Sequence, residues 1–534
     1  MNITEFELKY KEYILQFEGE TGKKAILDNK LTKQFKKWFK QKRKIEKAYS
    51  MISQGIIGVE YLKTLKRACG VKNLKDVTAL SPLADPFRAT KVDREKAEWF
   101  LDVWEKEGSL NIHPRGLHYR ILGKYTYKLR DNQGNHIGDR EYENTSQSWH
   151  HLLNTCKWAR YFQLVDYDVI KDMKNPRPLK NYYLNDLIYN ELDLDVVIYD
   201  VEDGVNDYYG LSTNFYDDIN DFMDIYTSNI INSLFNDVKY PSIKEQPNYI
   251  EIWAEKQGVI PENVAREFKA TVRPAGGGEF SINMCYDAIK CAKQRKKNLF
   301  IFMLVDFDPK GEDMPKSVAR KVELIAKQMG VIAFVEPIGL TEEQCIEHEL
   351  PQIPAKTGGK AYETLTETWK KSRGRDPTEL NSFMALKPEE YNETIRNAIS
   401  PYYDSTLNEK IEKVIKEVKD DIKIELKKNI EKYREEIIKF QRIIKTKFEY
   451  LNKIINKKKE EIGIDKIVDD YKKLLKPNLK ESLKGIKLEI PKADVSDPVN
   501  VLLDTRRNYL EQIDYYKDFD YRYKLIKGAK ENGN

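Results

Sequence analysis

The chain has 534 residues, of which 40% are hydrophobic, 33% are charged and 11% are aromatic. This length predicts two or three globular units, and this composition excludes a disordered chain. No apolar run approaches the roughly 20 residues of a membrane helix, and the first residues are too acidic for a secretory signal, so we expect an intracellular protein without a membrane partner. The five cysteines include no CxxC pair, which argues against a disulfide framework or a structural zinc cluster.

The net charge of +5 is unevenly distributed along the chain. Residues 181–238 contain no Lys or Arg and thirteen Asp or Glu, which leaves a charge of +18 on all the other residues. A basic body with a segregated acidic segment is one way to present a polyanion-binding surface, although a solvated charged face has the same composition. Charge alone leaves both interpretations open.

The N-terminal third predicts two helical regions. Residues 1–92 have helical spacing and many lysines, especially between Lys33 and Lys47, and we expect a helical N-terminal region there. In residues 93–180 a helix is expected from Thr145 to Phe162, opened by a Thr or Ser cap. A short extended segment, Leu164-Val165, follows it. Within residues 93–180, the succession of a helix, a turn, a second helix and a short extended segment predicts a winged helix-turn-helix domain for DNA binding.

Residues 181–244 are the acidic segment, and interleaved aromatic and branched residues predict that it is a folded insertion. From residue 245 to 400, apolar strands alternate with helical segments. The expected strands are Tyr249–Ala254, Ala270–Val272, Asn298–Val305 and Val331–Val335, and the expected helices include 280–294 and Met314–Met329. Such alternation predicts an open parallel sheet with helices on its faces and ligands at the carboxyl ends of its strands.

The last region, residues 401–534, predicts a lysine-rich helical tail. Residues 402–462 contain no Gly or Pro, and their apolar residues recur at three- and four-residue steps, a heptad-like pattern typical of a coiled coil. We favour a helical hairpin or a dimerisation strut over direct DNA contact, because runs of charge are usually solvated. The expected fold class is therefore α/β plus α.

Carboxylates follow two of the apolar strands. Glu255 ends the first strand, and Asp306 and Asp308 end the strand Asn298–Val305. Two aspartates at positions i and i+2 beyond a buried strand project side by side, and a third acid from a neighbouring strand completes an oxygen cage. Oxygen ligands favour magnesium or manganese over zinc. The alternative is that this DxD sequence is a simple turn, because Asp and Pro are common turn residues.

These motifs resemble those of a known family. An apolar strand followed by Glu255, then a strand ending in the DxDPxG of residues 306–311, resembles the Toprim domain of topoisomerases, primases and related nucleases. Together with the sequence Arg115-Gly116-Leu117-His118-Tyr119 in the expected winged helix, the chain resembles the topoisomerase VI A-subunit family, and within it the stand-alone "mini-A" members. The resemblance covers roughly residues 95–175 and 245–400. It leaves the first ninety residues, the acidic insertion and the tail unexplained.

The resemblance implies that Tyr119 is a nucleophile and Arg115 its companion in a magnesium-dependent, type IIB DNA-cleaving enzyme. Arg115 and Tyr119 are four residues apart and share one face of a helix, so the guanidinium can hold the phosphate that the phenol attacks. A tyrosine phenol with a pKa of about 10 needs a nearby cation or base to react at neutral pH. His118 is expected to be a packing residue, because neighbours on a helix do not face each other.

The resemblance also implies partners. The expected partners are double-stranded DNA and a second copy of the chain in a homodimer. The expected location is with the nucleoid. No ATPase signature is present, so ATP-coupled strand passage would require a separate ATPase subunit. Glu379 lies in a segment that resembles a short acidic motif of the family, but it receives no role. His150 and His151 are expected to pack or to be solvated, with phosphate contact as the alternative.

Two other functions fit the same residues. A Toprim nuclease would activate water at the metal site and form no covalent link to DNA, and Tyr119 would then be a structural aromatic. A non-catalytic DNA-binding protein would bind DNA with a steep salt dependence and would not cut it.

Overall fold

The computed structural model describes residues 6, 9–27, 30–80, 85–109, 111–131, 133–170, 180–183, 219–235, 245–275, 280–353, 360–454, 470 and 491–519. The chain divides into two compact units. One comprises Met1–Tyr183, Pro247–Tyr403 and Ser496–Asn534, and the other comprises Leu184–Gln246 and Asp404–Val495. Within the described residues, no helix combines the length and the apolar character that crossing a membrane requires.

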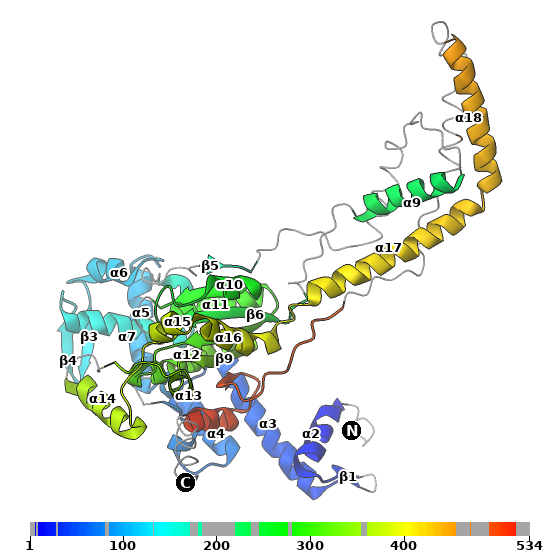
Figure 1. Cartoon of the computed structure of the whole chain (residues 1–534). Coiled ribbons are helices and arrows are strands. Elements are labelled where there is room, and N and C mark those ends of the chain that lie inside the picture. The colour runs from blue at the N-terminus through cyan, green and yellow to red at the C-terminus, as the bar shows by residue number, and fades with distance from the viewer. Residues whose placement is uncertain are drawn as a thin grey trace. The chain divides into compact units, whose positions relative to one another are not determined.

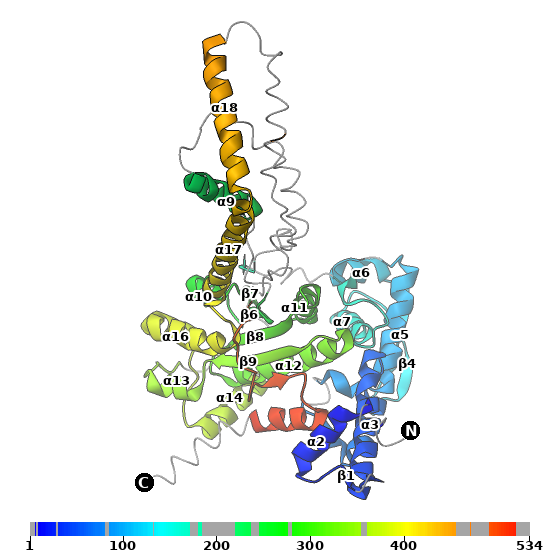
Figure 2. The same ribbon diagram turned by 90° about the vertical axis from the view of Figure 1, so that its right-hand side faces the viewer.

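The first unit contains a six-stranded sheet, seen in Figures 1 and 2. Its strands lie in the order β10-β9-β8-β6-β7-β5. The strands are β5 (Lys180–Asn181), β6 (Asn248–Ala254), β7 (Thr271–Pro274), β8 (Asn298–Leu304), β9 (Ala333–Gly339) and β10 (Leu503–Asp504). The four inner strands are parallel, and the two short edge strands run antiparallel to their neighbours. The predicted parallel α/β sheet is therefore present.

Strands β6 and β8 are buried on both faces, which explains their nearly continuous apolar sequences. One charged residue interrupts β6. Glu251 is completely buried, and it accepts hydrogen bonds from the guanidinium of Arg273 at 2.6 and 3.0 Å and from the indole of Trp253 at 2.6 Å. The pair joins β6 to β7 and satisfies a charge that would otherwise be costly in the interior.

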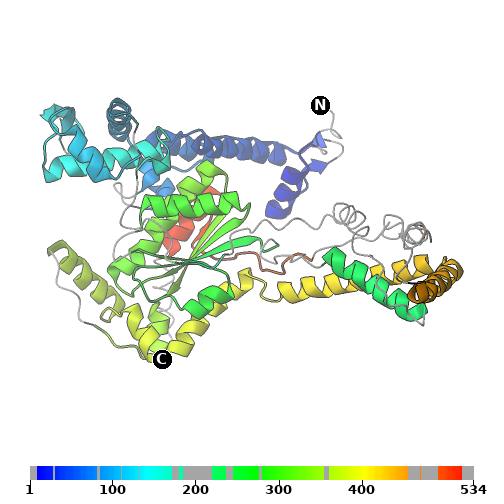
Figure 3. The same ribbon diagram turned by 90° about the horizontal axis from the view of Figure 1, so that it is seen from above.

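Helices cover both faces of the sheet. The helices after β6 are α10 (Glu262–Glu267), α11 (Ile282–Gln294), α12 (Pro309–Met329), α13 (Glu342–Glu347), α14 (Lys360–Arg373), α15 (Leu380–Leu386) and α16 (Pro388–Ile399). Residues of α10, α15 and α16 form one hydrophobic core with one face of the sheet. Helices α11 and α12 pack against each other and against β8 and β9 respectively. The result is a three-layer arrangement, visible from above in Figure 3.

The N-terminal region is helical, as expected. Its elements are α2 (Lys11–Thr21), β1 (Ile26–Leu27), β2 (Lys30–Leu31), α3 (Lys33–Ser53), α4 (Val59–Cys69) and the 3₁₀ turns η1 (Leu74–Val77) and η2 (Pro86–Arg88). Helix α3 begins at an N-cap, where the side chain of Thr32 accepts a hydrogen bond from the amide of Phe35. It contacts α2, α4 and α12.

Residues 91–169 form a helical group with a β-hairpin. The elements are α5 (Lys91–Lys106), α6 (Pro114–Ile121), β3 (Thr126–Arg130), β4 (His136–Glu141), α7 (Ser146–Tyr161) and η3 (Tyr167–Val169). Thr145 caps α7, as predicted. The short extended segment expected at Leu164-Val165 is instead a bend. The strands of this region are β3 and β4, which lie before α7. They pair with each other and are joined by a short turn.

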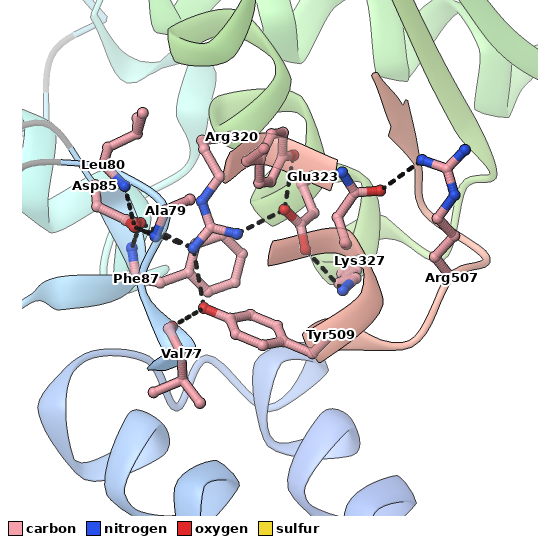
Figure 4. A network of polar contacts seen from close by, with 12 residues as sticks. Val77, Ala79, Leu80, Asp85, Phe87, Arg320, Glu323, Lys327, Arg507 and Tyr509 are labelled. Atoms are coloured by element: carbon pink, nitrogen blue, oxygen red, sulfur yellow. Dashed lines mark hydrogen bonds and ion pairs between the residues drawn. The ribbon is translucent and has the colours of Figure 1, made fainter. Parts of the chain in front are cut away.

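A buried polar network joins three distant parts of the chain within the first unit (Figure 4). Arg320 of α12 is completely buried. Its guanidinium lies 3.0 Å from a carboxylate oxygen of Asp85 and 2.7 Å from one of Glu323, and it donates to the hydroxyl of Tyr509 at 3.0 Å. Burial alone would raise the pKa of Glu323, but the charges of Lys327 and Arg320 lower it to about 2. The network fixes α12 against the N-terminal region and the C-terminal segment.

The second unit combines the acidic insertion with the tail. Helix α9 (Ile219–Phe235) packs along α17 (Leu407–Glu431), and α18 (Arg434–Ile454) follows α17. The carboxylate of Asp224 pairs with Lys427 and lies 3.9 Å from the ammonium of Lys423. These boundaries differ from the expected ones. The insertion and most of the tail form one unit, while residues 496–534 group with the sheet.

Candidate active site

The carboxyl ends of β6 and β8 bring two of the predicted acids to one edge of the sheet. These strands pair in parallel with Ala254 opposite Leu304, and the amide of Glu255 donates to the carbonyl of Leu304 at 3.3 Å. Glu255 and Asp306 therefore follow directly from adjacent strands. The predicted position of the acids at the strand ends is confirmed.

The charges of two neighbouring acids act on the pKa of Glu255. Burial raises the pKa of this carboxyl above its usual range, and the negative charges of Asp306 and Asp308 raise it further. Lys310 and Lys256 act in the opposite direction. A set of carboxylates that repel one another gains stability when a cation binds between them.

Asp306 is buried, with 5% of its surface exposed, and both of its carboxylate oxygens have protein donors. One oxygen accepts from the ammonium of Lys256 at 2.7 Å, and the other accepts from the amide of Leu380 at 2.9 Å. The lysine supplies the positive charge that a buried carboxylate requires. It lies directly beside Asp306, at the predicted position of a divalent cation.

Asp308 has a structural role in addition to its predicted one. It is the N-cap of α12, and its carboxylate accepts from the amide of Gly311 at 2.6 Å. The helix therefore begins at Pro309, earlier than the predicted Met314, because an Asp cap followed by Pro in the first turn is a strong helix start. A Cβ on Gly311 would lie 2.0 Å from the carbonyl oxygen of Asp306, so only glycine fits here.

Glu379 is the residue of this site to which the sequence assigned no role. The segment before α15 runs beside the end of β8, where Phe307 and Thr378 exchange two backbone hydrogen bonds of 2.9 and 3.0 Å. Glu379 follows Thr378, and its carboxylate lies 3.5 Å from the ammonium of Lys256. Lys256 thus lies between two acids. The motif resemblance was the one sequence signal that pointed to Glu379.

A small hollow of about 10 Å³, with room for about one water molecule, adjoins Asp306. Its walls come from the ends of β8 and β9, from the first turns of α12 and from Phe519 of the C-terminal segment.

The donor set fits magnesium in its chemistry. Glu255, Asp306 and Asp308 offer carboxylate oxygens alone, which hard divalent cations prefer. Within the described part of the chain, no group of three or more His, Cys, Asp or Glu side chains is arranged as a coordination shell. Asp306 is bound to Lys256 instead, so metal binding would require the lysine and the acids to rearrange.

The predicted nucleophile lies on α6. Tyr119 has 58% of its surface exposed, and Arg115 is exposed on the same helix with its guanidinium 5.4 Å from the ring centre of Trp149. His118 points inward. Its ring nitrogens lie 2.8 Å from the hydroxyl of Tyr142 and 3.2 Å from the amide oxygen of Asn144, which confirms the predicted packing role.

His151 also packs in the interior of this region. Its ring stacks on Tyr127 at 4.1 Å and meets the edge of Trp99 at 4.8 Å. Burial and the charge of Lys96 lower its pKa from 6.5 to about 4. The interpretation of His151 as a packing residue is confirmed, whereas His150 is exposed.

The structure places Glu255, Asp306 and Asp308 after the ends of adjacent strands but does not bring Tyr119 to them. In the described parts of the chain, no hydrogen bond, ion pair or ring contact joins Arg115 or Tyr119 to Glu255, Asp306 or Asp308. Comparison of the chain with models of protein families, with curated proteins and with solved structures finds no match. The functional argument therefore depends on the residues themselves.

Proposed function

We propose that this chain is a magnesium-dependent DNA-cleaving enzyme of the topoisomerase VI A type, with a Toprim-like sheet and a winged-helix-like region around α6 and α7. The observation that carries the proposal is the convergence of Glu255, Asp306 and Asp308 at the carboxyl ends of adjacent parallel strands, with mutual repulsion at Glu255. This placement is the one that ligand sites of open α/β sheets favour. The exposed Tyr119 supports the covalent form of the reaction.

In the proposed reaction, the oxygen of Tyr119 attacks a DNA phosphorus and the bond from phosphorus to the 3′ oxygen breaks. The phenol loses its proton to solvent, and the leaving oxygen gains one to become a free 3′ hydroxyl. Arg115 would hold the non-bridging phosphate oxygens and favour the phenolate form. His118 is a poor base for this step because both of its ring nitrogens already have partners.

Glu255, Asp306 and Asp308 would hold magnesium, which when bound supplies positive charge for the phosphate oxygens and the leaving oxygen. Lys256 neutralises Asp306 before the metal binds. Because one tyrosine cuts one strand, a double-strand break requires two chains. The family resemblance supports a homodimer in which the tyrosine of one chain meets the acids of the other. Strand passage coupled to ATP would need a separate ATPase subunit.

A covalent trap tests the proposal. Full-length protein, end-labelled duplex DNA and magnesium are incubated, and the reaction is stopped with detergent. We expect label linked to protein through a 5′ phosphate. Tyr119→Phe should abolish the adduct, whereas Tyr125→Phe, a matched tyrosine whose hydroxyl donates to Glu107 at 3.1 Å, should retain it. Cleavage without an adduct, retained by Tyr119→Phe, would contradict the proposed mechanism and support the Toprim nuclease.

A mixing experiment tests the shared site. Tyr119→Phe and Asp306→Asn are each expected to be inactive. If the tyrosine acts on the acids of the partner chain, a mixed dimer contains one complete site and regains nicking of a single strand. If the site lies within one chain, the mixture stays inactive. A protein that binds DNA and never nicks it, with or without these changes, would be the non-catalytic alternative.

A further inference from the structure

Helix α3 carries a large positive charge. Its 21 residues, Lys33–Ser53, contain eight Lys or Arg and one acid, Glu46. The hydroxyl of Tyr13 donates to Glu46 at 2.7 Å. The helix belongs to the N-terminal region, which neither the family resemblance nor the proposed cleavage site explains.

The basic residues of α3 form one exposed stripe. They recur at steps of three and four residues, as side chains on one face of a helix do. The exposed members are Lys33, Lys36, Lys37, Lys40, Arg43, Lys44 and Lys47. The opposite face is fixed in the protein, because Phe35, Ala48 and Ile52 are buried with at most 1% of their surface exposed.

This stripe has no acidic counterpart on its own helix. The ion pairs among the described residues include none of its seven members. Helix α17 is a useful contrast, since its 25 residues contain seven Lys and seven Asp or Glu. Like charges four residues apart, such as Lys36 with Lys40 and Lys40 with Lys44, destabilise a helix. The stripe therefore does not serve the stability of the chain, and its charge suits an external anion.

The spacing of the charges matches a nucleic-acid strand. Residues 33–47 span about 21 Å of helix at 1.5 Å per residue, and they present seven exposed cations, or roughly one every 3 Å. One strand of duplex DNA carries a phosphate about every 3.4 Å along the axis. A straight, rigid row of cations at this density fits a phosphate backbone.

We propose that the exposed basic face of α3 is a binding surface for the phosphate backbone of duplex DNA, without sequence preference. This binding does not depend on the cleavage chemistry proposed above. Helix α3 contacts α12, whose N-cap is Asp308. In Figure 3, α3 lies above the sheet. DNA held by α3 would therefore lie at a fixed position relative to the body of the sheet.

An anionic membrane is the competing partner, and the structure favours DNA over it. Helices that bind a membrane surface insert a wide apolar face into the lipid while their lysines contact the head groups. The apolar residues of α3 are instead engaged within the protein. Phe35, Ala48 and Ile52 are buried, and Trp38 and Phe39 are partly buried against the cluster that Phe17 and Phe35 form. Without a free apolar face, α3 retains the electrostatic part of the attraction alone.

The test measures DNA affinity and its salt dependence by fluorescence anisotropy, in EDTA so that no cleavage occurs. The full chain and the variant Lys33→Gln/Lys36→Gln/Lys40→Gln/Lys44→Gln bind a labelled 30-base-pair duplex between 50 and 200 mM salt. Each phosphate that the variant leaves without a cation should reduce the slope of log K against log salt by about 0.9. With four cations removed, we expect a slope smaller by roughly 3.6 and an affinity at least tenfold weaker at about 100 mM salt.

A matched control removes the same number of charges from α17, as Lys413→Gln/Lys416→Gln/Lys419→Gln/Lys428→Gln. It should keep the slope and the affinity of the unmodified chain. The α3 variant should fold, since its like-charge repulsion is weaker, and circular dichroism checks this. If the α3 variant binds DNA as the unmodified chain does, the proposal is overturned. If that variant keeps DNA binding but loses binding to phosphatidylserine vesicles, the partner of α3 is a membrane, which also overturns it. Asp306→Asn, which should abolish cleavage without changing the slope, separates this proposal from that of the active site.

Discussion

The ammonium of Lys256 lies 2.7 Å from a carboxylate oxygen of Asp306 and 3.5 Å from one of Glu379. The lysine comes from the loop after β6, and the two acids come from segments that are 73 residues apart in sequence. It neutralises the acid that the proposed metal would bind. Lysine and metal are therefore competitors for Asp306, and this competition can be measured.

Lys256→Met should strengthen metal binding. The substitution removes the ammonium from Asp306 while keeping the length of the side chain, so the carboxylate charge becomes available to a cation. We expect magnesium or manganese affinity to rise severalfold, measured by isothermal titration calorimetry without DNA. Lys310→Met, which removes a charge that acts on Glu255 but no hydrogen bond to Asp306, is the matched comparison. Weaker metal binding in Lys256→Met would show that the lysine positions Asp306 and does not compete with the metal.

Arg115→Ala should reduce formation of the covalent adduct by roughly 100-fold, the effect typical of losing one donor to a reacting oxygen. The guanidinium is exposed and contacts Trp149, so the fold should survive. Arg120→Ala changes an exposed arginine of the same helix, which pairs with Glu107 at 3.4 Å, and should reduce the adduct much less. Quantified adduct from a single incubation measures both. Equal losses in the two variants would argue against a specific role for Arg115.

Gly311→Ala should disturb the acidic edge. Its added Cβ would meet the carbonyl oxygen of Asp306 at 2.0 Å, so the chain must shift, at a cost of about 1 to 3 kcal/mol of unfolding free energy. Metal binding should weaken with it. Gly19→Ala is the control. Gly19 lies within α2 with no atom near its added Cβ, and alanine there should stabilise the helix by roughly 0.5 to 1 kcal/mol. Chemical denaturation compares the two, and equal effects would contradict the steric argument.

Arg320→Ala should destabilise the first unit strongly. The change leaves Asp85 buried without its cation and leaves Glu323 paired with Lys327 alone, and breaking a buried pair typically costs about 3 to 5 kcal/mol. Lys106→Ala removes an ion pair to Asp102 in which both side chains are more than half exposed, and should cost less than about 1 kcal/mol. Urea denaturation followed by tryptophan fluorescence measures both. A small effect of Arg320→Ala would mean that water or a rearrangement satisfies the two acids.

His151 should make stability depend on pH. Its pKa is about 4 in the folded chain and 6.5 when unperturbed. Between these pH values the unfolded chain binds more protons than the folded chain. The contribution of the neutral ring to the free energy of unfolding is therefore complete above pH 6.5 and is lost as the pH falls through about 4. The loss should amount to about 3 kcal/mol. The unfolding midpoint of the unmodified chain, measured between pH 4 and 7, should approach that of His151→Gln as the pH falls. If the two midpoints change with pH in parallel, the lowered pKa of His151 is contradicted.

The parts of the fold that depend on local pattern were predictable. The apolar runs at β6 and β8, the cap at Thr145 and the acids after the strands all follow from short stretches of sequence. The bend at Leu164-Val165 was expected to be extended, and two apolar residues are too short a run to distinguish a bend from an extended segment.

The contacts that complete the site were not predictable, because they join distant segments. Asp306 accepts from the amide of Leu380, 74 residues away, and Arg320 reaches Asp85 across 235 residues. Nothing in the local sequence of Lys256 indicates which acid it will meet. The strand β10 has two residues, too few for any periodicity. The structure also joins the acidic insertion to the tail through α9 and α17, a pairing that the charge balance of each segment alone did not specify.

The position of β10 has a consequence for synthesis of the protein on the ribosome. This strand pairs with β9 through Leu503 opposite Val335 and Asp504 opposite Phe334. At translation speeds of about 5 to 20 residues per second, β9 emerges many seconds before its partner. During that interval its outer edge carries unpaired backbone groups, which other chains can join. The nascent chain is thus open to edge-to-edge association until β10 has been translated.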